Sequence, residues 1–494
     1  MLERLKQIDY SSLKTILFFG LIVRLIAAIF SEGYGMHDDH YLVIEAAGSW
    51  VDGHDYNHWL PWTPGNTGNP EGHSFTYVGL NFLLLSFFKL IGIADPKLLM
   101  LLNRLVHALF SLLVIRYGYK ITERLADKKT AVLVGWFIAL LWAMPFLSVR
   151  NLVEVASMPF LVWGVWLSIR DDKKSTFFYA GLLIGMAISF RYQIAIYAVG
   201  MGMWYLFKLQ WSKLLPFAAG TIVTFLITQG LVDYTIWGYP FAEFYAYVIY
   251  NMNEGTGYMT NTNYFMYFYV LFGLFLFPLG ILAFIGYFRS AKKYMILFLP
   301  TFLFLLFHSI FPNRQERFIL TILPLVIVLA FLGIRELRQR VFWNKFWRIS
   351  WIAFWILNIP MILIFSTTTS KKSRMDSMYA LYKHSKGNEH ILLEATGEST
   401  PEMMPFFYAG NWDFKIAERR LEDTTSLQTY KTYPHDFIFF FGQKNLDKRI
   451  GEFKEIYPKM TKQNEIQPSL VDRTLHKINP RNSNSYIEIW KTNQ

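Results

Sequence analysis

The chain has 494 residues, of which 53% are hydrophobic and only 17% are charged, whereas soluble globular proteins carry about 25% charged residues. This composition excludes an ordinary soluble domain and indicates that lipid is the solvent. The net charge of +12 would suggest nucleic acid in a soluble protein, but here the basic residues stand in short loops between apolar runs, so membrane topology explains them. The absence of cysteine excludes disulfides, thiolate metal sites and a cysteine nucleophile.

Long apolar runs predict about eleven transmembrane helices, since several of them reach the ~17–25 residues that cross a bilayer. These runs lie near 11–30, 98–118, 131–148, 153–169, 176–190, 192–207, 214–232, 264–288, 294–310, 318–334 and 346–366. The polar stretch Met1–Lys14 has no small-residue cleavage site after it. We therefore interpret the first run as a retained helix and not as a removed signal peptide.

A further apolar run, Tyr77–Ala94, conflicts with the charge distribution if it crosses the membrane. The loop 116–129 is rich in Lys and Arg and is therefore expected in the cytoplasm. A span at 77–94 would place that loop outside. We therefore expect 77–94 to be an interfacial or re-entrant helix within a first extracytoplasmic loop of 31–97.

The loops between the runs differ in charge according to their predicted side. The predicted cytoplasmic loops are rich in Lys and Arg: 1–10, 119–130, 170–175, 208–213, 289–293 and 335–345. The predicted outer segments 31–76 and 233–263 contain no Lys or Arg. Four arginines on the outer side break this bias and need a structural or functional reason, namely Arg150, Arg191, Arg314 and Arg317.

The composition becomes polar and mixed from about residue 368. Strand-like runs appear there between Gly, Pro and Asn clusters, at His390–Ala395, Asp436–Phe441 and Tyr486–Trp490. An odd number of spans places this region outside the cytoplasm. The sequence thus predicts an all-α multi-pass membrane domain over 1–367 and a small extracytoplasmic α/β domain over 368–494.

Two adjacent carboxylates follow the first span. Asp38 and Asp39 stand between His37 and His40, and a carboxylate at a membrane surface offers a general base. The same four residues offer oxygen and nitrogen ligands for a divalent metal. A solvated acidic turn explains the pattern equally well.

A second polar motif, His308–Phe318, joins two predicted spans at the outer face. A histidine, two arginines and a glutamate next to hydrocarbon are costly unless they are paired or functional. Because arginine forks match phosphate oxygens, a phosphate-bearing lipid is the expected partner. The alternative is interfacial anchoring, with Glu316 paired to an arginine.

A third polar group, Arg150–Glu154, lies at the outer end of a span, and Arg191 ends another span at that level. Arg150 and Glu154 can also neutralise one another without any functional role. The outer loop 233–263 is rich in aromatic residues and includes Asn251. Such aromatic side chains form an interfacial belt or stack on sugar rings. All of these groups fall on one face of the predicted topology.

The motifs resemble those of glycosyltransferase family 22, the dolichyl-phosphate-mannose-dependent mannosyltransferases of GPI-anchor and N-glycan assembly. Family members carry His-Pro-Asp-Glu after the first helix and an acidic residue a few positions later. Here the motif stands as His37-Asp38-Asp39-His40, with Glu45 following. His37 and Asp39 match, whereas Asp38 and His40 replace the proline and the glutamate.

Later motifs resemble the family in the same order along most of the chain. In this chain, Arg150–Glu154 and Arg191-Tyr192 resemble two arginine-containing motifs of the family. A loop motif of the family resembles the set Asp233, Trp237-Gly238, Asn251, Gly255 and Tyr267. The His-Ser…Glu-x-Arg-Phe signature is retained at His308, Ser309, Glu316, Arg317 and Phe318. The stretch Ile391–Pro401 is similar to the tail of the branch that adds the third GPI mannose.

The resemblance implies a GT-C fold and an inverting transfer of a hexose, expected to be mannose. The sugar would move from a polyprenyl or dolichyl phosphate to a glycolipid or glycan. It implies Asp39 as the general base, with Asp38 as second choice. The donor phosphate would contact His308, Arg314 and Arg317, assisted by Arg150 and Arg191, with supporting roles for His37, His40, Glu45, Glu316 and Asn251. No cofactor is expected, because a single phosphate leaves; the metal alternative at His37–His40 stays open.

Other classes are also compatible with many apolar helices. A lipid or glycan transporter places its polar groups near mid-membrane, whereas here they gather at one surface. A non-catalytic glycan-binding membrane protein would use only the aromatic loop and the C-terminal domain. The expected location is a bacterial inner membrane with the site facing the periplasm, or the ER membrane with the site facing the lumen. Nucleic acid is not an expected partner.

Overall fold

The computed structural model describes residues 8–66, 68–253, 263–382, 387–397, 403–421, 423, 430, 434–478 and 485–493. The chain divides into two compact units, each built from separate stretches of sequence. Unit 1 contains residues 1–29, 58–80 and 104–367, and unit 2 contains residues 30–57, 81–103 and 368–494. Unit 1 ends and unit 2 resumes at the predicted boundary between 367 and 368.

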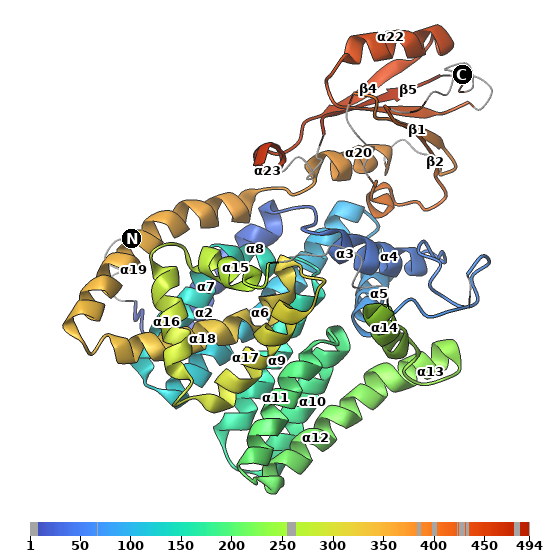
Figure 1. The fold of residues 1–494 in the computed structure, drawn as a ribbon. Coiled ribbons are helices and arrows are strands. Elements are labelled where there is room, and N and C mark those ends of the chain that lie inside the picture. Colours follow the sequence, from blue (N-terminus) through green and yellow to red (C-terminus); the bar gives the residue numbers. More distant parts are fainter. Residues whose placement is uncertain are drawn as a thin grey trace. The chain divides into compact units, whose positions relative to one another are not determined.

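Unit 1 is a bundle of apolar helices (Figure 1). Its helices are α2 (Leu13–Phe30), α7 (Lys128–Leu140), α8 (Ala143–Leu147), α9 (Val153–Arg170), α10 (Lys174–Phe190), α11 (Ile194–Phe207), α12 (Trp211–Phe225), η2 (Leu226–Leu231), α13 (Val232–Trp237), α14 (Ala242–Asn253), α15 (Met266–Phe275), α16 (Leu279–Ser290), α17 (Met295–Ile310), η3 (Glu316–Ile322), α18 (Leu323–Leu337) and α19 (Val341–Thr367). Helices α5 (Phe75–Leu90) and α6 (Pro96–Leu125) are each divided between the two units.

Each of the predicted spans coincides with a helix or with consecutive helices. Within the described residues, six helical segments are long and apolar enough to cross a membrane, or seven if the bent pair α15–α16 is one span. Helices α10, α11 and α17 are apolar but shorter, as is α5, which covers most of the run predicted to be interfacial. The chain is therefore a multi-pass membrane protein, and the number of crossings stays a prediction.

Small residues allow the helices of the bundle to approach backbone to backbone. A Cβ on Gly181 of α10 would stand 2.1 Å from the carbonyl oxygen of Phe217 in α12. A Cβ on Gly333 of α18 would stand 1.9 Å from the carbonyl oxygen of Gly286 in α16. Close packing of this kind replaces the hydrophobic effect as the force that holds helices together in lipid.

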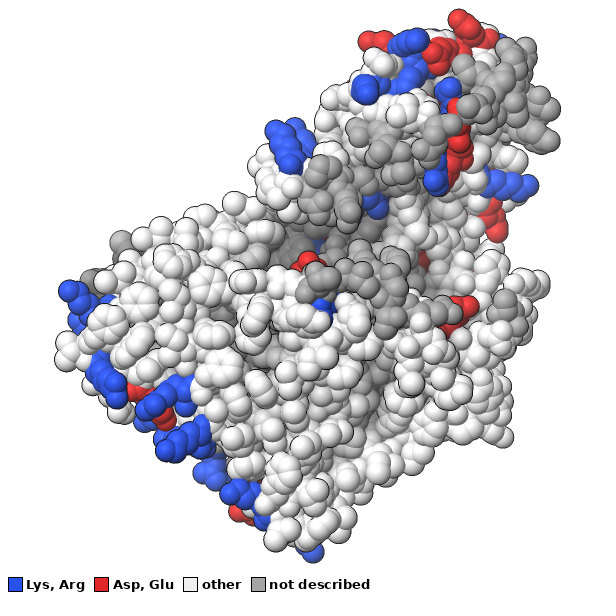
Figure 2. Space-filling model, in the orientation of Figure 1, with Lys and Arg blue, Asp and Glu red and all other residues white. Residues whose placement is uncertain are grey.

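The basic loops of unit 1 lie at one end of the bundle, which we call the basic end. It consists of the loops 119–130, 170–175, 208–213, 289–293 and 335–345. Contacts connect neighbouring loops. Arg124 Nε donates a hydrogen bond to the Ile169 carbonyl at 3.4 Å. Ion pairs join Asp127 to Arg335 at 2.6 Å, Asp172 to Lys213 at 2.6 Å and Glu336 to Arg289 at 3.7 Å. Figure 2 shows Lys and Arg, with a few Asp and Glu, gathered along the lower left edge of the helical part, most of whose visible surface is uncharged. The assignment of this end to the cytoplasm stays a prediction.

Unit 2 contains a five-stranded sheet with the strand order β2-β1-β3-β5-β4. The strands are β1 (His390–Glu394), β2 (Lys415–Arg419), β3 (Phe437–Phe441), β4 (Thr461–Ile466) and β5 (Ile487–Lys491). Strand β1 pairs in parallel with β2 and β3, whereas β5 pairs antiparallel with β3 and β4. The helices of this unit are α3 (His37–His40), η1 (Tyr41–Glu45), α4 (Ala46–Val51), α20 (Lys372–Tyr382), η4 (Phe406–Ala409), α22 (Leu446–Ile456) and α23 (Leu470–Ile478). The sheet confirms a small C-terminal α/β fold, whereas the predicted bounds of this domain and its extracytoplasmic side stay predictions.

Part of the first predicted outer loop belongs to unit 2 and is tied to its C-terminal residues. Tyr41 Oη donates to the carbonyl of Met403 at 2.6 Å, and Trp412 Nε1 donates to Asp52 at 2.9 Å. Tyr379 Oη donates to Asp95 at 2.7 Å. These bonds join stretches that are far apart in the sequence, so α3, η1 and α4 form one unit with the sheet.

Candidate active site

Three helix ends of unit 1 bring together a buried charged group, the Glu154 cluster, formed by Glu154, Arg191 and Arg317. Glu154 is in the first turn of α9, Arg191 follows the last residue of α10, and Arg317 is in the first turn of η3. Helices α9 and α10 run between this cluster and the basic end, so the cluster lies at the other end of the bundle. The sequence analysis singled out all three residues, and the fold joins them.

The cluster carries a surplus of positive charge. Glu154 Oε1 lies 3.1 Å from Nη1 of Arg191 and 3.6 Å from Nη1 of Arg317. Glu154 is fully buried, and its one carboxylate faces two guanidinium groups, so these three side chains together carry one net positive charge. The ring of Phe318 lies 4.6 Å from Cζ of Arg191 and 5.5 Å from Cζ of Arg317. A net positive charge in a buried position favours the binding of an anion.

Several donors of the cluster are unused. Among the residues that the structure describes, Nε and Nη2 of Arg191 are buried without a hydrogen-bond partner, and neither oxygen of Glu154 accepts a hydrogen bond of good geometry. Buried polar groups are nearly always satisfied in native proteins. The Arg191 fork is therefore positioned to bind the oxygens of an anionic ligand.

His308 lies beside the cluster, near the end of α17. Its Nδ1 donates to the carbonyl of Phe304 at 2.8 Å, because a carbonyl oxygen only accepts. The ring lies 6.1 Å from Phe318 and 6.3 Å from Tyr267. Nε2 is buried without a partner within the described part of the chain. In the neutral ring Nε2 is an acceptor, so His308 can donate to a phosphate only in its protonated form.

The other predicted phosphate-binding arginines make different contacts. Arg314 Nε donates to the carbonyl of Ser309 at 2.9 Å and its Nη2 to that of Ile310 at 3.2 Å, so its guanidinium caps the C-terminus of α17. Arg150 is buried, with Cζ 4.3 Å from the centre of the Phe146 ring. Both contacts hold the architecture of this end of the bundle.

Glu316 does not pair with an arginine in the described regions, where it is exposed to solvent. The sequence-based alternative in which Glu316 neutralises an arginine of its own motif is therefore wrong for these regions. Glu154, from a distant part of the sequence, is the carboxylate that contacts Arg317. Helix packing determines this pairing, and spacing along the chain cannot reveal it.

A second acidic group, which sequence reasoning missed in part, lies where α13 turns into α14. Glu243 Oε2 accepts from the backbone amides of Gly72 at 2.7 Å and His73 at 2.9 Å. Asp233 accepts from the backbone amide of Glu243 at 2.9 Å. Burial raises the pKa of Glu243 to about 7. The loop motif named in the sequence included Asp233 but not Glu243.

The predicted supporting residue Asn251 lies in the last turn of α14. Its Nδ2 donates to the carbonyl of Tyr247 at 2.8 Å, and the Tyr247 side chain hydrogen-bonds with Gln193. Asn251 therefore stands on the helix that carries Tyr247. Gly255, from the same predicted motif, and residues 398–401 lie outside the described residues.

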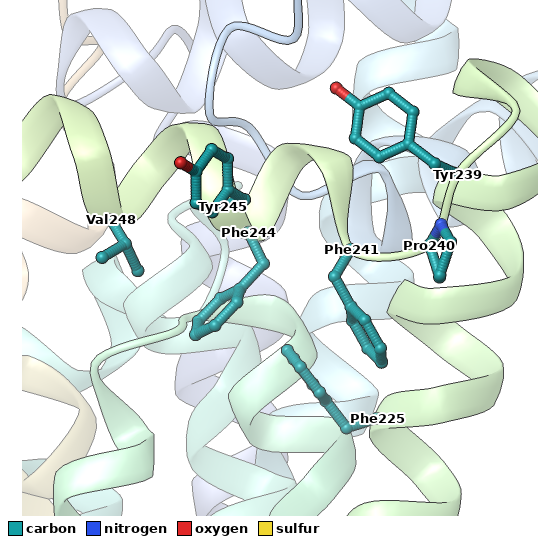
Figure 3. Close-up of a pocket in the computed structure, with 7 residues that line it drawn as sticks. All are labelled: Phe225, Tyr239, Pro240, Phe241, Phe244, Tyr245 and Val248. Carbon is teal, nitrogen blue, oxygen red and sulfur yellow. The ribbon is translucent and has the colours of Figure 1, made fainter.

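An apolar groove of about 510 Å³ lies between α12 and α14 (Figure 3). Aromatic side chains dominate its lining: Phe225, Tyr239, Phe241, Phe244 and Tyr245, with Pro240 and Val248. The Tyr192 ring lies 5.1 Å from the Phe244 ring, and Tyr192 directly follows Arg191 of the cluster. An apolar groove of this kind is suited to a hydrocarbon chain.

The predicted base, Asp39, belongs to unit 2 and is buried at the start of α3. Its Oδ2 accepts from the backbone amide of Gly35 at 2.8 Å and its Oδ1 from that of Met36 at 2.9 Å. These two bonds hold the carboxylate of Asp39 in place. His37 is exposed and Asp38 is half-buried.

His40 and Glu45 form a buried pair. Nε2 of His40 lies 2.9 Å from Oε1 of Glu45, and the imidazole is stacked between the rings of Tyr34 at 4.6 Å and Tyr408 at 5.4 Å. Glu45 also accepts from the backbone amide of Phe407 at 3.0 Å. Burial raises the pKa of Glu45. The pair therefore fastens the acidic segment to residues near 407 of the same unit.

A metal site was the alternative interpretation of His37–His40. In the described parts of the chain, no group of three or more His, Asp or Glu side chains is arranged to hold a metal ion. The contacts of Asp39 and His40 given above are with amides and with Glu45. Metal dependence stays an open prediction that an experiment must test.

Comparisons with known proteins agree with the motifs. A family model described as the Alg9-like mannosyltransferase family matches residues 15–402. A comparison with curated protein sequences finds no match.

Solved structures of similar fold include ArnT from Cupriavidus metallidurans bound to undecaprenyl phosphate, with a TM-score of 0.58, 11% sequence identity and 97% coverage of both chains. The oligosaccharyltransferase from Archaeoglobus fulgidus in complex with zinc and sulfate has a TM-score of 0.54 and 11% identity over 90% of this chain and 69% of that one. At such identities the similarity shows the fold, which is the GT-C fold.

Proposed function

Since the chain belongs to the Alg9-like mannosyltransferase family, and is thus a membrane glycosyltransferase, we propose that it moves a mannosyl group from a polyprenyl or dolichyl phosphate to a hydroxyl of a glycolipid or glycan. The reaction takes place on the extracytoplasmic face. In a bacterium this is the periplasmic side of the inner membrane, and in a eukaryote the lumenal side of the ER membrane.

The observation that carries the proposal is the Glu154 cluster beside the apolar groove. A lipid phosphate has a long hydrocarbon chain and a small anionic head. The groove at Phe225 and Phe244 suits the chain, and the unused donors of Arg191 suit the head. ArnT, which has the same fold, binds undecaprenyl phosphate, and this supports a polyprenyl phosphate donor here.

In the proposed reaction, the acceptor hydroxyl oxygen attacks C1 of the sugar as the bond from C1 to the phosphate oxygen breaks. Asp39 takes the hydroxyl proton, and the configuration at C1 inverts. The polyprenyl phosphate leaves with the bonding electrons and gains one negative charge. Arg191 and Arg317 stabilise that charge because it grows toward the transition state in a site with few competing waters. His308 can assist in its protonated form.

The remaining predicted residues have positioning roles in this proposal. Arg150 and Arg314 hold the ends of helices beside the cluster, and His40 with Glu45 holds the segment that carries Asp39. One phosphate leaves, so two arginines suffice for its charge and no metal is needed. Activity should therefore persist in EDTA. Family membership disfavours the transporter and the non-catalytic glycan-binding protein.

The central test is the Asp39→Asn variant of the purified protein, assayed with polyprenyl-phosphate mannose and membrane glycolipids. We expect transfer to be lost, because an amide cannot take the hydroxyl proton. Full transfer activity in this variant would remove Asp39 from the base role. Mass spectrometry of envelope glycolipids from cells that lack the gene identifies the natural acceptor.

Because Asp39 also accepts two backbone amides, the variant needs controls for folding. Asp38→Asn changes the neighbouring, half-buried carboxylate and should retain transfer. Asp39→Glu keeps a carboxylate and should retain part of it. If Asp39→Asn elutes and melts like the parent protein but does not transfer, the defect is chemical.

The proposal also requires the acidic segment and the cationic turn to face one aqueous compartment. The chain contains no cysteine, so single substitutions can be labelled cleanly in intact cells with a membrane-impermeant maleimide. We expect His37→Cys and Glu316→Cys to react from the same side, and Lys173→Cys at the basic end to be protected. Reaction of the first two from opposite sides would end the proposal.

A further inference from the structure

A second cavity, of about 490 Å³, opens at the basic end of unit 1, far along the helices from the Glu154 cluster. Three cationic side chains line it, namely Lys128 and Lys129 at the start of α7 and Arg338 just after α18. Its volume falls within the roughly 300–1,000 Å³ that is usual for ligand cavities. The cavity plays no part in the proposed transfer reaction.

Among the residues that the structure describes, the lining of this cavity contains no carboxylate. Within the described residues, Lys128 and Lys129 form no ion pair and Nε of Arg338 is buried without a hydrogen-bond partner. Asp127 is occupied by Arg335 at 2.6 Å and by the amide of Thr130 at 2.8 Å.

Asp9 also lies near Lys128, but its Oδ1 accepts from both the amide and the hydroxyl of Ser11. Burial lowers the pKa of the Arg338 guanidinium, and Arg348 adds to this effect. A desolvated cation without a counter-charge gains from a bound anion.

The rest of the cavity is apolar and aromatic. Val132 and Leu133 of α7 line it together with Trp347 and Trp351 of α19. The two indoles stack at 4.9 Å, and Cζ of Arg338 lies 4.9 Å from the Trp347 ring. The lining thus combines cationic side chains with apolar and aromatic ones, and a phospholipid likewise combines a charged head group with hydrocarbon.

Helix α19 presents a long exposed apolar face next to this cavity. Residues three and four positions apart on this helix are between 52% and 65% exposed: Ile349, Ile352, Ile356, Ile359 and Leu363. In a multi-pass membrane protein such a stripe faces lipid. A cavity at the end of this helix is therefore open to lipid molecules of the adjacent leaflet.

We infer that this cavity binds an anionic glycerophospholipid of the bilayer, with its phosphate head group at Lys128, Lys129 and Arg338 and an acyl chain along Val132 and Trp351. The described lining holds three cations and no carboxylate, so it favours an anionic head group over a zwitterionic one. Basic pockets between transmembrane helices bind anionic lipid head groups in this way. The bound lipid fixes the otherwise weakly buried α19 against α7.

The test uses the purified full-length chain, stripped of lipid and titrated with dioleoyl phosphatidylglycerol or dioleoyl phosphatidylcholine, with binding counted by native mass spectrometry. We expect phosphatidylglycerol to bind at least about tenfold more tightly than phosphatidylcholine. In the Lys128→Gln/Lys129→Gln variant, the affinity for phosphatidylglycerol should fall by about tenfold or more, because each basic residue near an anionic lipid raises the affinity roughly fivefold.

The matched control is Lys173→Gln/Lys174→Gln, which changes two exposed lysines at the start of another helix of the basic end. This control should bind phosphatidylglycerol like the parent protein. Three results would overturn the inference: equal binding of the two lipids, an equal loss in the control, or displacement of phosphatidylglycerol by an equal amount of undecaprenyl phosphate. The last result would make the cavity a second donor-lipid site.

Discussion

Replacing Glu154 by glutamine removes the only carboxylate of the buried cluster and raises its net charge from one to two. Glu154 Oε1 lies 3.1 Å and 3.6 Å from the two guanidinium groups, so each gross attraction is about 5 kcal/mol at an effective dielectric constant of about 20. Most of this gain offsets the cost of burying three charges. The measured loss when one partner of a buried pair is removed is about 3–5 kcal/mol, and we expect a destabilisation of that order.

The same substitution should strengthen binding of the lipid phosphate, because the uncompensated charge that destabilises the free protein attracts the ligand. We expect the melting temperature of the detergent-solubilised Glu154→Gln variant to be several degrees lower without ligand. Polyprenyl phosphate should then raise its melting temperature by more than it raises that of the parent protein. Melting curves followed by tryptophan fluorescence over a titration of polyprenyl phosphate give both quantities.

The control for this experiment is Glu316→Gln, which removes an exposed carboxylate without an ion pair in the described regions. It should change neither the melting temperature nor the response to ligand. A double variant, Glu154→Gln with Arg191→Gln, restores the charge balance and should regain part of the lost stability. If Glu154→Gln melts like the parent and responds equally to polyprenyl phosphate, the cluster is not an anion site.

Three further outcomes follow from the same geometry. Arg317→Ala should lower kcat/KM for the donor by about 10- to 100-fold, which corresponds to the loss of a charge-assisted hydrogen bond. The KM for the acceptor should change little. Equal losses for both substrates in steady-state kinetics would argue against contact between Arg317 and the phosphate. Phe244→Asp should abolish the preference of the enzyme for donors with a long lipid chain over donors with a short one. Competition assays with a long-chain and a short-chain donor measure this preference. Burial raises the pKa of Glu243 from 4.5 to about 7, so the folded state holds this proton more tightly and stability falls by up to about 3 kcal/mol as pH rises through that window. Glu243→Gln should remove that fall in melting experiments between pH 4.5 and 8.

Much of the fold was predictable because crossing a bilayer depends on local composition. A helix satisfies its own backbone hydrogen bonds, so an apolar run predicts a helix without knowledge of its neighbours. The runs near 153–169 and 176–190 became α9 and α10 almost to the residue. The same holds for β3, Phe437–Phe441, whose five residues are all buried.

The polar strands could not be predicted in this way. Strands β2 and β4 have the sequences KIAER and TKQNEI and lie at the two edges of the sheet. An edge strand exposes much of its surface to solvent, so it carries no apolar pattern. Pairing with β1 and β5 makes these segments strands, and such pairing is decided only when the chain has folded.

The sequence by itself determined which residues carry the unusual charges, because an arginine or glutamate beside hydrocarbon stands out against an apolar background. Arg191, Arg317 and Glu154 were visible for this reason. Only the tertiary structure decided their partners: Glu154 contacts two arginines from distant helix ends, and Glu45 holds His40 and Phe407. Coulomb attraction and desolvation depend on distances through space, and helix packing sets those distances.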